Sequence, residues 1–85
     1  MNYGTGEVAC LWDIVRIGDD IGQVEDVIIG GQQQQHWAVD EDGLMILHPV
    51  YGRAFESPTN SSWNDVRFIA RRLSLDARFN SSQTT

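Results

Sequence analysis

Residues 13–50 contain three strand-like apolar runs in close succession, and glycine and acidic residues separate each run from the next. Residues 13–17 alternate polar with apolar side chains, and residues 23–29 are rich in valine and isoleucine, which favour strands. Residues 18–22, between them, have the composition of a turn. Short strands joined by tight turns predict a mainly β chain, folded as a small antiparallel barrel or bent sheet of four or five strands.

A further hairpin is predicted at the end of this region. Residues 36–39 have the composition of a short strand, residues 40–43 are acidic and end in glycine, and residues 44–47 are apolar. The glycine is suited to the positive φ that hairpin turns require. Residues 51–62 then read as an irregular segment, because glycine, proline and asparagine interrupt them.

The strand predicted at residues 44–47 is apolar at every position, which is typical of burial on both faces of a sheet. A single chain of 85 residues has little material with which to cover a second face. We therefore expect a homo-oligomer in which this strand forms the interface. Its residues are Leu44, Met45, Ile46 and Leu47.

Residues 62–73 fit two patterns. As a helix, they have Ser62 as N-cap and an apolar stripe that includes Trp63, Val66 and Ile69. As a strand, Val66 and Phe68 alternate with arginines, but Ile69 then faces the wrong side. The helical pattern fits more residues, so we expect a short helical segment near the C-terminus that packs on the sheet.

The length of the chain limits it to one domain, in which about 60 to 65% of the surface of the unfolded chain is buried. We expect a lead-in of residues 1–6, a domain of residues 7–73 and a flexible tail of residues 74–85. Cys10, the sole cysteine, has no partner for an intramolecular disulfide. The sequence has neither a signal-like N-terminus nor an apolar run of about 20 residues, so we expect a cytoplasmic protein that does not contact membranes.

Charge is distributed unevenly along the chain, which carries a formal net charge of -6. Residues 1–52 hold nine carboxylates and one arginine, whereas residues 53–85 hold five arginines and three carboxylates. The two parts could pair with each other, within one fold or between subunits. The acidic excess disfavours nucleic-acid binding, because it would repel phosphates. It could instead imitate a phosphate backbone and occupy a basic surface on another protein.

Candidate catalytic and metal-binding residues are few. His36 and His48 have no metal-site spacing, and the carboxylates at 40–42 complete only part of a calcium loop. Cys10 has no nearby histidine or positive charge in the sequence that would activate it as a nucleophile. We therefore expect no metal and no cofactor, and the residues favour a binding protein over an enzyme.

Aromatic residues supply the candidate binding site. Trp12, Trp37 and Trp63 exceed what the core of a small barrel normally holds, so one indole is expected at the surface. A groove of Trp37, Tyr51 and Phe55 could bind a peptide or a flat ring, and acidic residues 19–20 and 40–42 would attract a basic partner.

The order of these segments resembles that of SH3-like barrels. The segments are Asp13-Ile14-Val15-Arg16-Ile17, Gly22-Gln23-Val24, Trp37-Ala38-Val39 and a strand that ends in Pro49-Val50. Within that class, the chain is similar to the plasmid-borne type II dihydrofolate reductases carried on mobile gene cassettes. In that family four subunits line one pore, in which folate and NADPH meet.

The resemblance implies a fold and an assembly, but not the reductase activity. The Val-Gln-Ile-Tyr motif of the family falls on Met45, Ile46, Leu47 and His48, so its glutamine and tyrosine are absent. An oligomeric small-molecule binder or enzyme with a shared pore, in which His48 would contact the ligand, is one alternative. An acidic inhibitor that mimics nucleic acid is another. The residues favour a non-catalytic acidic binding module, and the resemblance implies that it is encoded on a mobile element or gene cassette.

Overall fold

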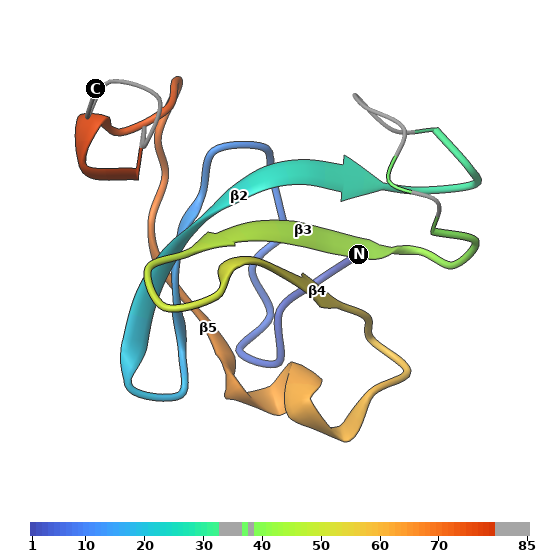
Figure 1. Cartoon of the computed structure of the whole chain (residues 1–85). Helices are drawn as coiled ribbons and strands as arrows, with labels where there is room; N and C mark the ends of the chain where they lie inside the picture. Colours follow the sequence, from blue (N-terminus) through green and yellow to red (C-terminus); the bar gives the residue numbers. More distant parts are fainter. Residues whose placement is uncertain (33–36, 38, 80–85) are drawn as a thin grey trace.

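The structure, a computed structural model, describes residues 1–32, 37 and 39–79 and contains one curved sheet of five antiparallel strands (Figure 1). The strands are β1 (Ile14–Ile17), β2 (Asp20–Ile28), β3 (Gly43–His48), β4 (Gly52–Glu56) and β5 (Val66–Ala70). Their order in the sheet is β4-β3-β2-β1-β5, so the chain forms a meander and β5 returns beside β1. The predicted mainly β antiparallel fold is confirmed, but β4 and β5 do not pair and the sheet is not a closed barrel.

Two tight turns define the hairpins. Gly18, at φ 60°, and Asp19 connect β1 to β2. The predicted turn at 18–22 was therefore too long, because β2 already begins at Asp20, which pairs with Ile17. Three residues connect β3 to β4, and Gly52, the first residue of β4, has φ 79°, a conformation that glycine adopts without strain.

Two loop and strand predictions around β4 are corrected. Residues 51–62 are not irregular throughout, because residues 52–56 form β4 and each of them pairs with a residue of β3. The strand predicted at 36–39 is absent at Trp37 and Val39, and residues 36 and 38 lie outside the described part of the chain. Residues 52–56 are extended because they pair with β3, and local composition does not record such pairing.

The helix predicted within residues 62–73 was also wrong. A short 3-10 helix, η1 (Ser61–Asp65), is followed directly by β5, and a second, η2 (Ala77–Phe79), lies after it. The pairing with β1 shifts so that Phe68 and Ala70 have partners and Ile69 has none. This β-bulge explains why the strand pattern seemed to fail at Ile69.

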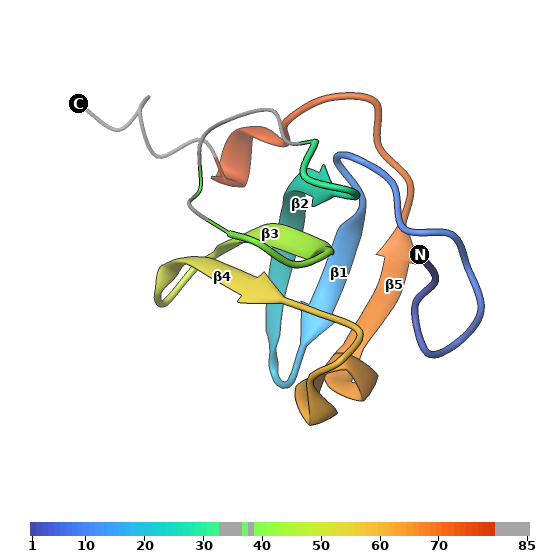
Figure 2. The same ribbon diagram turned by 90° about the vertical axis from the view of Figure 1, so that its right-hand side faces the viewer.

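One face of the sheet forms the main core together with the N-terminal residues. Tyr3 is buried, its ring stacks on Trp63 at 6.4 Å between centroids, and the Trp63 indole donates to the Asn2 carbonyl. In Figure 2 the N-terminal segment lies beyond β5, next to the edge of the sheet. The core cluster is Tyr3, Ala9, Val15, Val24, Leu44, Ile46, Trp63 and Val66.

The other face is also buried, and Gln23 fixes the segment that follows β5 to it. The Gln23 side chain is fully buried; its Nε2 donates to the carbonyls of Trp12 (2.9 Å) and Ser74 (3.0 Å), and its Oε1 accepts from the Asp76 N–H (2.8 Å). Ile14 and Ile28 are buried as well. Tyr3, which precedes the predicted domain of residues 7–73, and Ser74 and Asp76, which follow it, therefore take part in the packing.

Candidate binding site

The turn between β3 and β4 exposes two large apolar side chains. Val50 is 67% exposed and Tyr51 is 76% exposed. The Tyr51 ring rests against the His48 ring, with 4.8 Å between centroids. An aromatic side chain that remains exposed at a turn, while one side is supported by the protein, offers its free face to a partner.

His48 makes this turn rigid. Its Nδ1 accepts hydrogen bonds from the N–H groups of Val50 (3.1 Å) and Tyr51 (3.3 Å). Because Nδ1 accepts, the neutral ring carries its proton on Nε2. That Nε2 lies 3.4 Å from Oδ2 of Asp20, at the start of β2. The buried histidine thus joins the β3–β4 turn to the β1–β2 hairpin, and the two turns lie at the same end of the sheet (Figure 1).

Negative charge lies next to the exposed aromatic ring. Asp19 is exposed in the β1–β2 turn, and the Asp20 side chain is 41% exposed beside His48. A cationic group of a ligand could pair with these carboxylates while an aliphatic chain or the cation itself lies on Tyr51. The geometry therefore suits a ligand that is both basic and apolar.

Trp37 and Phe55 do not join His48 and Tyr51 in one groove. The Trp37 indole donates to Oδ2 of Asp26 (2.7 Å), which is buried, and the Arg53 guanidinium lies 5.2 Å from the centre of the Trp37 ring. Phe55 pairs with Met45. Strand alternation places Phe55 on the face of the sheet opposite to His48. Trp37 is thus held by contacts within the fold.

Arg53 is also held within the fold. Its Nε and Nη2 bind the two carboxylate oxygens of Glu25 at 2.6 and 2.9 Å. The hydrogen bond to Glu25 raises the pKa of Arg53, which keeps this bidentate pair charged. A β-bulge in β2 makes the pair possible: Val24 and Asp26 have partners on β3 and Glu25 has none, so Glu25 turns toward β4.

The predicted interface residues are largely buried within the single chain. Leu44 and Ile46 are completely buried, Met45 is 8% exposed and Leu47 is partly buried. One chain covers most of this strand: Leu44 and Ile46 belong to the core cluster on one face, and Met45 is buried on the other. The continuous apolar run therefore needs no second copy to explain it.

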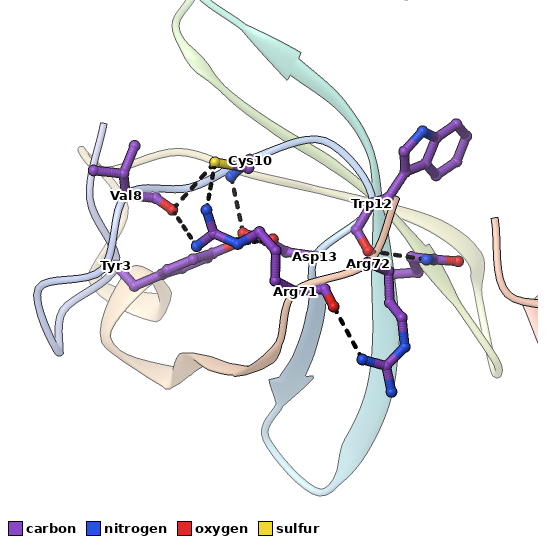
Figure 3. A network of polar contacts seen from close by, with 8 residues as sticks. Tyr3, Val8, Cys10, Trp12, Asp13, Arg71 and Arg72 are labelled. Atoms are coloured by element: carbon purple, nitrogen blue, oxygen red, sulfur yellow. Dashed lines mark hydrogen bonds and ion pairs between the residues drawn. The ribbon is translucent and has the colours of Figure 1, made fainter. Parts of the chain in front are cut away.

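The sequence analysis missed a buried polar network around Asp13 (Figure 3). Asp13 is completely buried, and its Oδ2 accepts hydrogen bonds from the Tyr3 hydroxyl (2.7 Å) and the Cys10 N–H (2.9 Å). Nε of Arg71, just after β5, lies 2.9 Å from Oδ1. Oδ1 has no hydrogen bond of good geometry in the described part of the chain, so the guanidinium offsets its charge as an ion pair.

This network fixes the protonation state of Tyr3. Burial raises the pKa of the Tyr3 hydroxyl, and its hydrogen bond to the negative Asp13 raises it further. The phenol therefore stays neutral and donates to the carboxylate. Only the pairing of β1 with β5 brings Asp13 near Arg71, so spacing in the sequence offered no signal for the cluster.

Cys10 has a positive neighbour that the sequence analysis did not foresee. Nη1 of Arg71 lies 2.8 Å from the Cys10 sulfur, and Nη2 donates to the Val8 carbonyl (3.0 Å). His48, the histidine within the described residues, contacts Asp20 and its own turn instead. Arg71 thus ties the N-terminal segment to the end of β5, and within the described residues no histidine contacts Cys10 to act as the base that a nucleophile would need.

Within residues 1–32, 37 and 39–79, no group of three or more histidine, cysteine or carboxylate side chains is arranged to hold a metal ion. His36 lies outside these ranges. No helix in the described part of the chain has the length and hydropathy to cross a bilayer.

Comparison of the chain with protein-family models, curated proteins and solved structures gives no match in any of the three. The resemblance to SH3-like barrels and to type II dihydrofolate reductases therefore has no support from a homologue. The site must be interpreted from its own geometry.

Proposed function

We propose that this protein is a small, non-catalytic binding module that recognises a basic and apolar segment of a partner at its β3–β4 turn. The observation that carries the proposal is the exposed Tyr51, supported by His48 and flanked by Asp19 and Asp20. An aromatic anchor with satisfied polar neighbours at its rim is the usual composition of a binding hot spot. The carboxylates would steer a cationic partner to the ring.

An SH3-like arrangement is part of this proposal. Four meandering strands, a 3-10 helix between β4 and β5, and the return of β5 beside β1 support it. Folds of this kind serve many functions, so the arrangement by itself does not identify the partner. The binding residues are therefore taken from the turn and not from the fold.

The side chains that could act in catalysis are engaged in contacts within the fold, which favours binding over catalysis. Asp13 and Tyr3 are buried and bound to each other, Cys10 is bound to Arg71, and Glu25 is bound to Arg53. Each of these contacts connects segments of the fold. The exposed turn, by contrast, presents Tyr51 and Val50 without such a role.

Substitution of Tyr51 tests the proposed function. A fluorescein-labelled peptide of alternating arginine and valine serves as the probe, and fluorescence anisotropy measures its binding. We expect Tyr51→Ala to weaken the affinity about tenfold, which corresponds to about 1.4 kcal/mol. The Asp19→Asn/Asp20→Asn variant should also weaken it, and added salt should reduce the difference between this variant and the wild type.

Leu73→Ala is the matched control, because Leu73 is 95% exposed but lies after β5 and far along the chain from the turn. It should bind the probe as the wild type does. Circular dichroism establishes that each variant is folded. If the wild type does not bind the peptide, or if Tyr51→Ala binds as well as the wild type, the proposed site is wrong.

A further inference from the structure

Two arginines face each other across β1 and β5. Arg16 and Arg67 are direct cross-strand partners, and both side chains are exposed. In the described part of the chain, neither has an ion pair or a side-chain hydrogen bond. Arg53 and Arg71 differ from them, since these bind Glu25 and Asp13.

A third exposed arginine, Arg72, lies just after β5. It follows Ala70, which pairs with Ile14 after the bulge, by two residues, so continued alternation would place it on the same side as Ala70. The Arg72 side chain donates from Nη1 to the carbonyl of neighbouring Arg71 (3.0 Å). Figure 3 shows this side chain extending away from the Asp13 network. We call Arg16, Arg67 and Arg72 the arginine face.

Folding does not explain the arginine face. Like charges directly opposite each other in a sheet destabilise it, and this chain has twelve carboxylates and six basic residues from which to choose partners. Two guanidinium groups on neighbouring strands are, however, well placed to bind the same anionic group or two adjacent ones. Each can form a planar, bidentate contact with a carboxylate.

We propose that the arginine face binds an acidic segment of a partner protein, whose carboxylates pair with Arg16 and Arg67. Apolar side chains accompany the charges, because Ile69 is 44% exposed in β5 and Leu73 is 95% exposed just after it. The segment that fits carries glutamate or aspartate interspersed with apolar residues. Its charge is opposite to that of the ligand at Tyr51, so this surface is additional to the proposed function and independent of it.

Two other occupants are less well matched to the face. A nucleic acid would meet three unpaired arginines on a chain whose net charge is -6, and the acidic turn at Asp19 adjoins β1. Binding to a phosphate backbone normally depends on more cations than this. A second copy joined symmetrically through the same face would place arginines against arginines.

The test uses the whole protein and a fluorescein-labelled peptide of alternating glutamate and valine, at low ionic strength. We expect the wild type to bind this peptide, and the affinity of Arg16→Gln/Arg67→Gln to fall at least tenfold. The thermal midpoint of the variant should be equal to or above that of the wild type, because repulsion is removed. Binding should therefore fall without a loss of stability, which a structural role for these arginines would not produce.

Gln32→Glu/Asn60→Asp is the matched control for net charge. Both residues are exposed and lie outside β1 and β5, and the two substitutions change the charge by the same amount as the double arginine variant. This control should retain at least half of the wild-type affinity. Arg16→Lys/Arg67→Lys keeps the charge but loses the fork, so it should bind severalfold more weakly than the wild type.

Several outcomes would overturn the proposal. These are failure of the wild type to bind the peptide, an equal loss of affinity in the charge control, or tighter binding of a single-stranded oligonucleotide of the same charge. Self-association of the wild type that disappears in Arg16→Gln/Arg67→Gln would assign the face to a second copy instead. If the glutamine variant does not fold, the lysine variant decides: binding equal to that of the wild type contradicts recognition through the guanidinium forks.

Discussion

At the scale of single residues, buried polar groups with several partners connect the ends of the chain to the sheet. Asp13 receives hydrogen bonds from Tyr3 and Cys10 and an ion pair from Arg71. A buried carboxylate is stable only when such partners offset the loss of its hydration. The N-terminal segment and the end of β5 therefore depend on one side chain.

Removal of Arg71 should destabilise the fold, because the charge of buried Asp13 would lose its counterion. We expect Arg71→Gln to lower the free energy of unfolding by about 2 kcal/mol, less than for a fully buried pair since Arg71 is 45% exposed at its side chain. Arg72→Gln is the control and should change it by less than about 0.5 kcal/mol. Urea denaturation measures both, and equal values for the two variants would contradict this role of Arg71.

Tyr3 should make stability depend on pH in the alkaline range. Its pKa is raised in the folded state, so its contribution is complete below the unfolded value of about 10 and decreases as the pH rises above it. The decrease is about 1.4 kcal/mol per pH unit for one group. Tyr3→Phe should remove this part of the alkaline loss. Denaturation at pH 8 to 11 tests this, and parallel curves for the two proteins would contradict it.

At the scale of elements, β2 is the strand on which the other parts depend. It pairs with β1 at one end and with β3 along the rest, and its bulge directs Glu25 to Arg53. Gln23, on the same strand, holds Ser74 and Asp76. Because β2 curves between these partners, its neighbours approach it closely.

Gly22 in β2 should not tolerate a side chain. An added Cβ would lie 2.6 Å from the Leu47 carbonyl oxygen and 2.8 Å from Cγ2 of Ile46. We expect Gly22→Ala to lower the free energy of unfolding by about 2 kcal/mol. Gly4→Ala, whose Cβ would first meet Asn64 Oδ1 at 3.4 Å, should be close to neutral. Thermal denaturation compares the two, and a neutral Gly22→Ala would contradict the close approach.

At the scale of the whole molecule, exposed charges of opposite sign gather in different places. Asp19 and Asp20 flank the turn with Tyr51, whereas Arg16, Arg67 and Arg72 share the other region of the sheet. The acidic and basic parts of the sequence pair internally at Asp13–Arg71 and at Glu25–Arg53. The molecule therefore has two surfaces suited to partners of opposite charge.

Any self-association should be electrostatic. Leu44 and Ile46 are buried within the chain, so we expect contacts between copies to use the exposed charged surfaces and not the side chains of this strand. We expect an oligomer, if one forms at low salt, to dissociate at about 1 M salt, where the screening length is about 3 Å. Light scattering on a sizing column measures this. An oligomer that persists at high salt would show that an apolar interface has been overlooked.

The sequence by itself indicated the strands β1, β2 and β3, because the alternation of polar and apolar residues and the content of β-branched residues are local properties. It placed a turn after β1 but made it too long, and it did not predict the turn between β3 and β4. Exposure of Tyr51 and the pairing of some arginines with carboxylates were within its reach as hypotheses. From the sequence, Trp37 and Phe55 were predicted to share a groove with Tyr51, because a sequence does not show which face of the sheet each side chain occupies.

Tertiary structure decided the rest. Residues 66–70 are a strand because β1 offers them an edge and a bulge accommodates Ile69, whereas their local pattern fits a helix better. The Asp13 network and the unpaired Arg16 and Arg67 likewise exist only once β5 lies beside β1. Pairing between segments that are distant in the sequence brings these charges together, and such pairing cannot be inferred from the spacing of the residues along the chain.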